Sequence, residues 1–172
     1  MVPLKIALLD STVRREHFLS GSPALDRYIQ QQATQDIRRR VSACFVAMDD
    51  ESILHGYYTL ACASVLLDEL PADIQKKLPR YAAVPAVRMG RLAVSKTSQG
   101  KGLGSALLAD ALVRASHSEI TAYALIVDAK DQDAARFYEH HGFMTLSNHP
   151  FRLFLPLATV SSLVNKQQRL NR

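Results

Sequence analysis

Residues 91–105, Arg-Leu-Ala-Val-Ser-Lys-Thr-Ser-Gln-Gly-Lys-Gly-Leu-Gly-Ser, join an apolar, strand-like run to a glycine-rich turn and then to a helix. One apolar stripe indicates that helix, and it is formed by Leu103, Leu107, Leu108, Ala111, Leu112 and Ala115. Free backbone N–H groups at the start of a helix lie beside the positive end of its dipole and bind phosphate. Glycines leave these amides open, because no Cβ blocks the phosphate oxygens. The stretch therefore predicts a phosphate or pyrophosphate site.

Two common phosphate-binding motifs do not fit this loop. A Walker A loop closes with Gly-Lys-Ser or Gly-Lys-Thr, which helps to hold a magnesium ion, and residues 99–105 contain neither. Dinucleotide-binding folds use the spacing Gly-x-Gly-x-x-Gly and an acidic residue at the end of the following strand. Here the glycines alternate at 100, 102 and 104, and Asp128 comes too late in the chain for that role. Both motifs are excluded.

Two separate signatures resemble those of the GNAT N-acetyltransferase superfamily. The order Gln-x-x-Gly-x-Gly at residues 99–104 is similar to its acyl-coenzyme A loop. Residues 131–143, a helix carrying Ala and Tyr before a Gly-Phe turn, resemble its C-terminal signature. The resemblance covers about residues 41–157. It implies an α/β (α+β) fold with a mixed, mostly antiparallel sheet, whose central strands splay apart and are flanked by helices.

The resemblance also implies acetyl-CoA as the cosubstrate, no metal, and a set of residues that bind the coenzyme. These lie on the strand before the turn, in the turn and its helix, and at the start of a later helix: Leu92, Ala93, Val94, Gln99, Gly100, Lys101, Gly102, Leu103, Gly104, Ser105, Asp131 and Ala134. Asp131 departs from the family pattern, because many members have Asn there, and a contact from its side chain to the coenzyme is therefore in question.

Tyr138, within the second signature, is the expected catalytic residue. A phenol is neutral at pH 7 and can donate a proton to the departing thiolate; the alternative is an aromatic core residue like Phe137. Residues 74–109 contain no acid, so the strand at 87–94 offers no carboxylate as a general base. An α-amine has an unperturbed pKa of about 7.7–8.0 and is partly neutral without one. The histidines at 117, 140 and 141 are interpreted as solvated side chains, with a role as general base as the alternative.

Further segments resemble a narrower group, the GNAT toxins of bacterial toxin–antitoxin modules. These segments are residues 25–28, 30–33, 56–60, 78–81, 89–94 and 127–130. Such toxins acetylate the α-amine of aminoacyl-tRNA, block translation and are bound by a ribbon-helix-helix antitoxin. The resemblance implies the same substrate and partner for this chain. The alternatives are a GNAT enzyme that acts on a protein or small-molecule amine, and an inactive member that only binds a regulator.

The charge distribution is compatible with an RNA partner. The chain has 21 Lys and Arg against 16 Asp and Glu, a net charge of +5 and a sequence pI near 9.4. Basic side chains contact phosphates without reading sequence, and the tRNA-binding candidates are Arg38, Arg39, Arg40, Arg88 and Arg91. Lys101 is assigned instead to the coenzyme phosphates. The alternative for the arginines is a solvated basic face.

With 172 residues, 48% of them apolar, the chain fits one acetyltransferase domain at 1–157 followed by a polar tail at 158–172. Cys44 and Cys62 lack metal-ligand spacing and are expected to be buried, reduced thiols. Without a signal peptide or membrane segment, the expectation is a cytoplasmic protein; a homodimer is left open.

The expected elements follow from periodicity and turn signals. They are a helix after residue 22 that ends at residues 38–40, a hairpin of strands 41–48 and 53–67, a helix 71–78 with Pro71 at its first position, a strand 87–94, the helix after residue 102, a strand 122–127, a helix 131–141 capped by Gly142, and strands 143–146 and 151–157.

Overall fold

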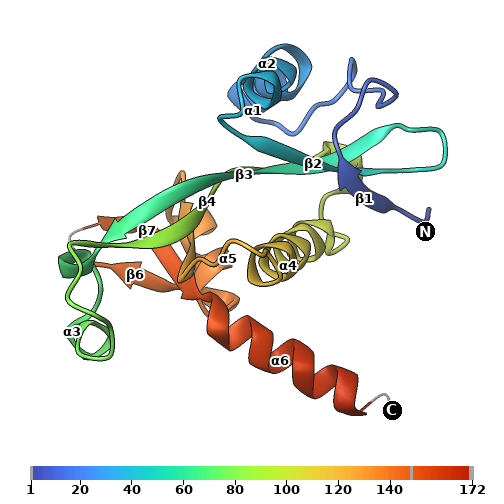
Figure 1. Ribbon diagram of the computed structural model, residues 1–172. Helices are drawn as coiled ribbons and strands as arrows, with labels where there is room; N and C mark the ends of the chain where they lie inside the picture. Colours follow the sequence, from blue (N-terminus) through green and yellow to red (C-terminus); the bar gives the residue numbers. More distant parts are fainter. Residues whose placement is uncertain (1, 148, 171–172) are drawn as a thin grey trace. The chain divides into compact units, whose positions relative to one another are not determined.

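The computed structural model describes residues 2–147 and 149–170 (Figure 1). Its helices are α1 (Pro23–Arg27), α2 (Ala33–Arg38), α3 (Ala72–Gln75), α4 (Leu103–Ser116), α5 (Gln132–His140) and α6 (Leu157–Leu170). Its strands are β1 (Lys5–Leu8), β2 (Ala43–Met48), β3 (Leu54–Leu66), β4 (Ala83–Val94), β5 (Ala124–Asp128), β6 (Met144–Leu146) and β7 (His149–Pro156).

The described strands form a sheet in the order β1-β2-β3-β4-β5-β7-β6. β4 and β5 run parallel, whereas the β1–β2, β2–β3, β5–β7 and β6–β7 pairs are antiparallel. The predicted mixed, mostly antiparallel sheet flanked by helices is therefore confirmed. By contacts the chain divides into two compact units, one of residues 2–61 and 90–111, the other of the remaining described residues.

The first unit is built on the β2–β3 hairpin, which Figure 1 shows beneath α1 and α2. Tyr57 and Tyr58 are neighbours on β3, and both are fully buried. Tyr57 packs edge-on against Phe18 and donates its hydroxyl to the Leu25 carbonyl at 2.7 Å. Tyr58 stacks on Phe45 at 5.1 Å between ring centroids. Alternate residues of a strand point to opposite faces, so the hairpin is covered on both.

The predicted helix after residue 22 is interrupted. A π-helical turn, Tyr28–Gln32, lies between α1 and α2. One face of the segment is apolar, since Tyr28, Ile29 and Ala33 are buried and Leu25 and Ile37 pack against the same core. The helix ends as expected in the arginine triplet, where Arg40 adopts a left-handed φ of 58°.

The bounds of β4 and α3 differ from the prediction, and each difference involves a proline. β4 begins at Ala83, earlier than predicted, and includes the exposed Pro85, whose carbonyl accepts the Tyr123 N–H at 2.8 Å. Proline occurs in a strand where the ladder needs no donor. Pro71 is the N-cap of α3 rather than its first helical residue, and α3 ends at Gln75 instead of residue 78.

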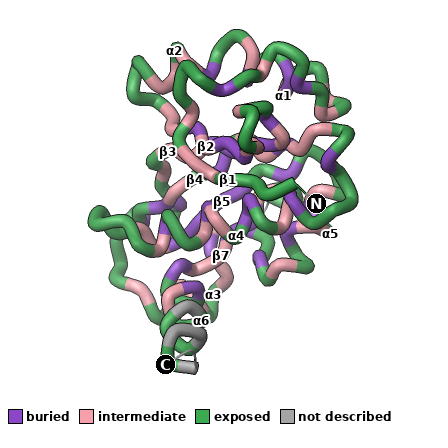
Figure 2. Tube along the Cα trace, turned by 90° about the vertical axis from the view of Figure 1, so that its right-hand side faces the viewer, coloured by how far each residue is buried: buried purple, intermediate pink, exposed green. Residues whose placement is uncertain are grey.

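The second unit contains β5, β6, β7, α5 and α6, with a core that includes Val65, Ile126 and Phe154. The described part of the segment interpreted as a polar tail belongs to a helix, α6, whose first turn carries the buried Leu157 and Val160. Figure 2 shows buried residues concentrated along the strands. None of the described helices is both long enough and apolar enough to cross a bilayer.

The two cysteines differ. Cys44 is buried as expected, and burial raises the pKa of its thiol to about 12. Cys62 is exposed, which corrects the expectation of a buried thiol. In the structure it lies on β3 beyond the part of the hairpin that is covered on both faces.

Candidate functional site

The strand, glycine-rich turn and helix expected at residues 91–116 form in the structure, and the turn lies in the first unit. β4 ends at Val94, a 3-10 turn covers Lys96–Ser98, and α4 begins at Leu103. Gly100 and Gly102 have left-handed φ values of 74° and 82°. A Cβ built on either glycine would have no heavy atom within 4 Å, so the space beside these amides is open. This cradle fits the pyrophosphate of a coenzyme, because side chains at these positions would occupy it.

Gln99 fixes the shape of the loop. Its side-chain Nε2 donates to the carbonyl oxygens of Val94 at 2.9 Å and Ser20 at 2.7 Å. The Lys96 N–H also donates to the Leu19 carbonyl at 2.8 Å. Hydrogen bonds thus connect the loop to the end of β4 and to the segment that leads into α1. This explains why glutamine opens the motif.

The other predicted coenzyme contacts of this unit lie around the same loop. Exposed Lys101 donates from Nζ to the Thr97 carbonyl at 3.0 Å, so its charge lies beside the open amides. The β4–β5 pairing ends at Met89, and therefore residues 92–94 have no β5 partner in the described structure. Leu103, Gly104 and Ser105 form the first turn of α4.

The second signature lies in the second unit. Asp131 is the N-cap of α5, and its Oδ1 accepts the Ala134 N–H at 2.8 Å. The carboxylate and this amide therefore satisfy each other within the helix start. The Asp131 side chain thus has a local capping role, which an Asn would also fill, and coenzyme contacts from Asp131 and Ala134 stay predictions.

Tyr138 of α5 is 7% exposed, with its ring 5.5 Å from that of Phe143. Burial, and secondly the negative charge of Asp128, raise the pKa of its phenol to about 12. The group therefore keeps its proton at neutral pH and suits an acid rather than a base. In the described residues no buried side-chain N or O lacks a partner, and no protein group bonds the Tyr138 hydroxyl. We infer that this hydroxyl reaches the surface.

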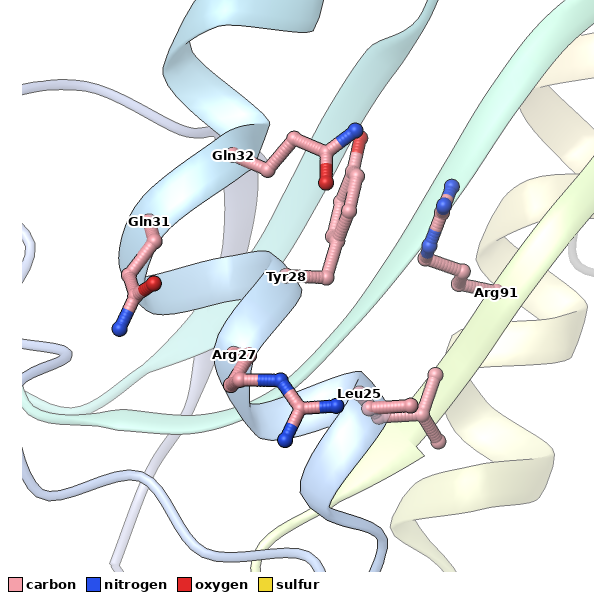
Figure 3. Close-up of a pocket in the computed structure, with 7 residues that line it drawn as sticks. Leu25, Arg27, Tyr28, Gln31, Gln32 and Arg91 are labelled. Atoms are coloured by element: carbon pink, nitrogen blue, oxygen red, sulfur yellow. The ribbon is translucent and has the colours of Figure 1, made fainter.

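A pocket of about 390 Å³ opens in the first unit beside α1 (Figure 3). It is lined by Ala24, Leu25, Arg27, Tyr28, Gln31, Gln32 and Arg91. Figure 3 shows the Arg91 guanidinium beside the Tyr28 ring, and its Cζ lies 3.6 Å from the ring centroid. The Tyr28 hydroxyl donates to Asp36 at 3.0 Å. None of the lining residues carries a carboxylate, so the pocket is cationic.

The candidate tRNA-binding arginines are not equivalent. Arg38, Arg39 and Arg40 are exposed, and none pairs with a described carboxylate. Arg91 is held against Tyr28. Arg88, in the second unit, lies 3.9 Å from Asp128, which also pairs with Arg152 at 3.0 Å. The charge of Arg88 is therefore partly neutralised.

Hydrogen bonds at the start of the phosphate loop join three side chains that the sequence did not single out, those of Asp49, His55 and Ser98. The His55 ring bonds Ser98 Oγ at 2.8 Å through Nδ1 and Asp49 Oδ2 at 2.9 Å through Nε2. A histidine in a strand carries no sequence signal of such a partner. His117 and His140 are exposed as expected, whereas His141 Nδ1 is bonded to the Phe137 carbonyl at 2.8 Å. The described residues contain no cluster of three potential metal ligands.

Residues 40–145 match a protein-family model that is described as "Acetyltransferase (GNAT) domain". The chain belongs to the GNAT acetyltransferase family. It is 34% identical over 149 residues to the tRNA-acetylating toxin of Mycobacterium tuberculosis, an alignment that covers 86% of this chain and 88% of the relative. The GNAT loop and the helix with Tyr138 both lie within the matched region, as the sequence resemblance implied.

Solved GNAT toxins share the architecture. AtaT complexed with acetyl-methionyl-tRNAfMet has a TM-score of 0.87 at 28% identity, covering 94% of this chain and 99% of that one. AtaTR bound with acetyl-CoA has a TM-score of 0.80 at 27% identity, covering 94% and 98%. A tyrosine-to-phenylalanine mutant of KacT has a TM-score of 0.87 at 27% identity, covering 93% and 98%.

The open loop predicts a selective effect of Gly102→Val. The substitution strains a left-handed residue by about 1–2 kcal/mol and places a side chain over the amides, so acetyl-CoA affinity should fall at least tenfold by calorimetry. Gly142→Ala is the control for strain, because Gly142 has a φ of 90° and its Cβ would lie 3.8 Å from Leu155. It should lose similar stability but keep acetyl-CoA affinity. Equal affinities in both variants would refute the loop assignment.

Proposed function

We propose that this protein is a toxin that transfers the acetyl group of acetyl-CoA to the α-amine of aminoacyl-tRNA and thereby blocks translation. The observation that carries the proposal is the joining, in one compact unit, of an open glycine cradle and a cationic pocket without carboxylates. The cradle suits a coenzyme pyrophosphate, and the pocket suits an anionic acceptor. Membership of the GNAT family and the likeness to a tRNA-acetylating toxin support the same function.

On the donor side, acetyl-CoA supplies an activated acetyl group as a thioester. The amides around Gly100 and Gly102 and the ammonium group of Lys101 bind its phosphates. Backbone N–H groups of residues 92–94, which have no β5 partner in the described structure, pair with the pantetheine arm. They also stabilise the negative charge that develops on the carbonyl oxygen.

On the acceptor side, the pocket distinguishes RNA from a free amine. Arg27 and Arg91 provide two cations for phosphates, and the amides of Gln31 and Gln32 provide donors and acceptors for a base or ribose. A polyamine carries several positive charges and would be repelled here. The charge of the pocket therefore favours aminoacyl-tRNA over the alternative of a small cationic amine.

The proton balance assigns one task to the protein. Tyr138 donates its proton to the departing thiolate, because the raised pKa keeps the phenol protonated in the physiological range. The α-amine of an aminoacyl group is already partly neutral at cellular pH. On attack the amine loses a proton to water, and water returns a proton to the Tyr138 phenolate. This route needs no carboxylate base, consistent with a run of 36 residues, 74–109, without an acid.

The partners and the domain limits belong to the same proposal. The likeness to toxins supports binding by a ribbon-helix-helix antitoxin, action in the cytoplasm where charged tRNA is found, and a homodimer as one assembly. We keep one acetyltransferase domain at 1–157. Residues 158–172 follow it, and the described part of that segment continues α6.

Offering charged tRNA pools and radiolabelled acetyl-CoA to the pure protein tests the acceptor directly. Label should appear on aminoacyl-tRNA. Hydrolysis of the ester bond to the tRNA should then release the label as an N-acetylated amino acid. Uncharged tRNA is the control and should stay unlabelled. If spermidine or a protein lysine outcompetes charged tRNA, the proposed substrate is wrong.

Tyr138→Phe removes one hydroxyl and keeps the ring that packs on Phe143. Turnover should fall by about 10²–10⁴-fold, the usual contribution of general acid catalysis, while acetyl-CoA affinity stays near that of the parent. Single-turnover acetylation and calorimetry measure the two quantities. A Phe variant that acetylates as fast as the parent would mean that another group supplies the proton.

The salt dependence of tRNA binding tests the role of the arginine triplet at residues 38–40. The log–log slope of tRNA binding against salt should be about −0.7 to −0.9 per phosphate neutralised. Arg38→Ala with Arg39→Ala should flatten it by about one to two units for every tRNA alike. Lys166→Ala with Arg169→Ala, on α6, removes the same charge and should leave the slope unchanged. Equal slopes in both double variants would contradict a role for the triplet.

A further inference from the structure

A chain of hydrogen bonds links the β2–β3 turn to the phosphate loop. Asp49, in that turn, bonds His55 Nε2 at 2.9 Å, and His55 Nδ1 bonds Ser98 Oγ at 2.8 Å. His55 is the second residue of β3, and Ser98 ends the 3-10 turn that precedes Gln99. All three residues belong to the first unit. The bonds therefore cross 43 residues of sequence to reach the loop.

Two hydrogen bonds connect His55 to the loop. Its carbonyl oxygen accepts the Ser95 N–H at 2.8 Å, and its ring bonds the hydroxyl of Ser98. Within the turn, the Ser98 N–H donates to the Ser95 carbonyl at 2.8 Å. Both ends of the 3-10 turn are thus attached to one residue of β3. The chain then enters Gln99 and the glycines from a fixed position.

The direction of the protons follows from the chemistry of the carboxylate. Asp49 is an acceptor, and bonds from the His55 ring and from backbone N–H groups keep the pKa of its carboxyl below the ordinary value. The N–H of His55 is therefore at Nε2, which leaves Nδ1 as an acceptor for the Ser98 hydroxyl. Asp49 Oδ1 also accepts the N–H groups of Glu51 at 3.0 Å and Ile53 at 2.9 Å, which holds the turn.

This trio does not form a nucleophilic site. Ser98 is 8% exposed, so its hydroxyl is shielded from a substrate. A hydroxyl activated for attack must be within reach of the carbonyl carbon. The hydrogen bonds are instead satisfied inside the protein, beside a loop whose own amides stay open.

We infer that Asp49, His55 and Ser98 form a relay that positions the backbone amides of the phosphate loop for the coenzyme, so that His55 and Asp49 are positioning residues for acetyl transfer. The inference rests on the proposed function, because it assigns the loop to acetyl-CoA. Two anchors then define the loop: the relay fixes its entry at Ser98, and Gln99 fixes its closure on Val94 and Ser20. Fixed amides bind an anion without first losing conformational freedom.

The relay predicts that Ser98→Ala weakens acetyl-CoA binding. The loss of one hydrogen bond to the loop should raise the Kd by about 2- to 10-fold, measured by calorimetry on the full chain without any acceptor. The turnover at saturating acetyl-CoA and the KM for charged tRNA should stay unchanged. Thr97→Ala is the matched control, because it removes a neighbouring exposed hydroxyl that bonds only Ser95 Oγ. It should bind like the parent.

Two further variants separate the relay from a general loss of packing. His55→Phe keeps a ring but removes both bonds, and adding Ser98→Ala to it should weaken binding no further. Asp49→Asn keeps an oxygen for the backbone N–H groups of the turn but removes the carboxylate that accepts the His55 Nε2–H. Its Kd should rise in the same direction as that of Ser98→Ala, and a Kd equal to that of the parent would contradict a role for Asp49.

The outcomes distinguish the two levels of the proposal. A parent protein that fails to bind acetyl-CoA overturns the proposed function itself. A parent that binds, with Ser98→Ala binding equally well, overturns the relay alone. Additive effects of His55→Phe and Ser98→Ala, or an equal loss in turnover at saturating acetyl-CoA, also overturn it, because a positioning role predicts a single coupled effect on affinity.

Discussion

The open backbone at the start of α4 is the constraint on which the site depends. Amides bind a pyrophosphate only if no side chain covers them and if the loop that carries them is held still. Gly100 and Gly102 meet the first requirement through their left-handed φ values and open surroundings. The side-chain amide of Gln99 meets the second by bonding both Val94 and Ser20. Hydrogen bonds from Gln99 to residues on either side of the loop thus hold it in place.

In the core of the first unit, neighbouring elements pack so closely that β3 needs a glycine at position 56. Gly56 of β3 lies beneath the loop's strand and helix, and a Cβ there would be 2.9 Å from a Leu107 methyl and 3.0 Å from the Ala93 carbonyl oxygen. A side chain at this position would push apart β3, β4 and α4, whose spacing sets the loop. The buried Tyr57 ties the hairpin to α1 through the Leu25 carbonyl. The packing that stabilises the unit also positions the pocket beside α1.

The pocket beside α1 and the phenol of Tyr138 differ in their electrostatics. The pocket gathers two guanidinium groups and no carboxylate, which favours a polyanion as the acceptor. Tyr138 shows the opposite influence, because burial and the nearby Asp128 disfavour a second negative charge and keep the phenol protonated. Both properties are compatible with the proposed acetylation of an amine carried by an RNA.

The sequence by itself determined the features whose physics is local. Glycine spacing at residues 99–104, the apolar stripe of α4 and the helix before Gly142 all depend on neighbours in the chain, and each forms as predicted. Only the tertiary structure decided which distant side chains meet. The bond of His55 to Ser98, the contact of Arg91 with Tyr28 and the burial of both faces of the β2–β3 hairpin join residues dozens of positions apart. Periodicity reports which face of an element is apolar, but the partner of a polar side chain is set by the packing of whole elements.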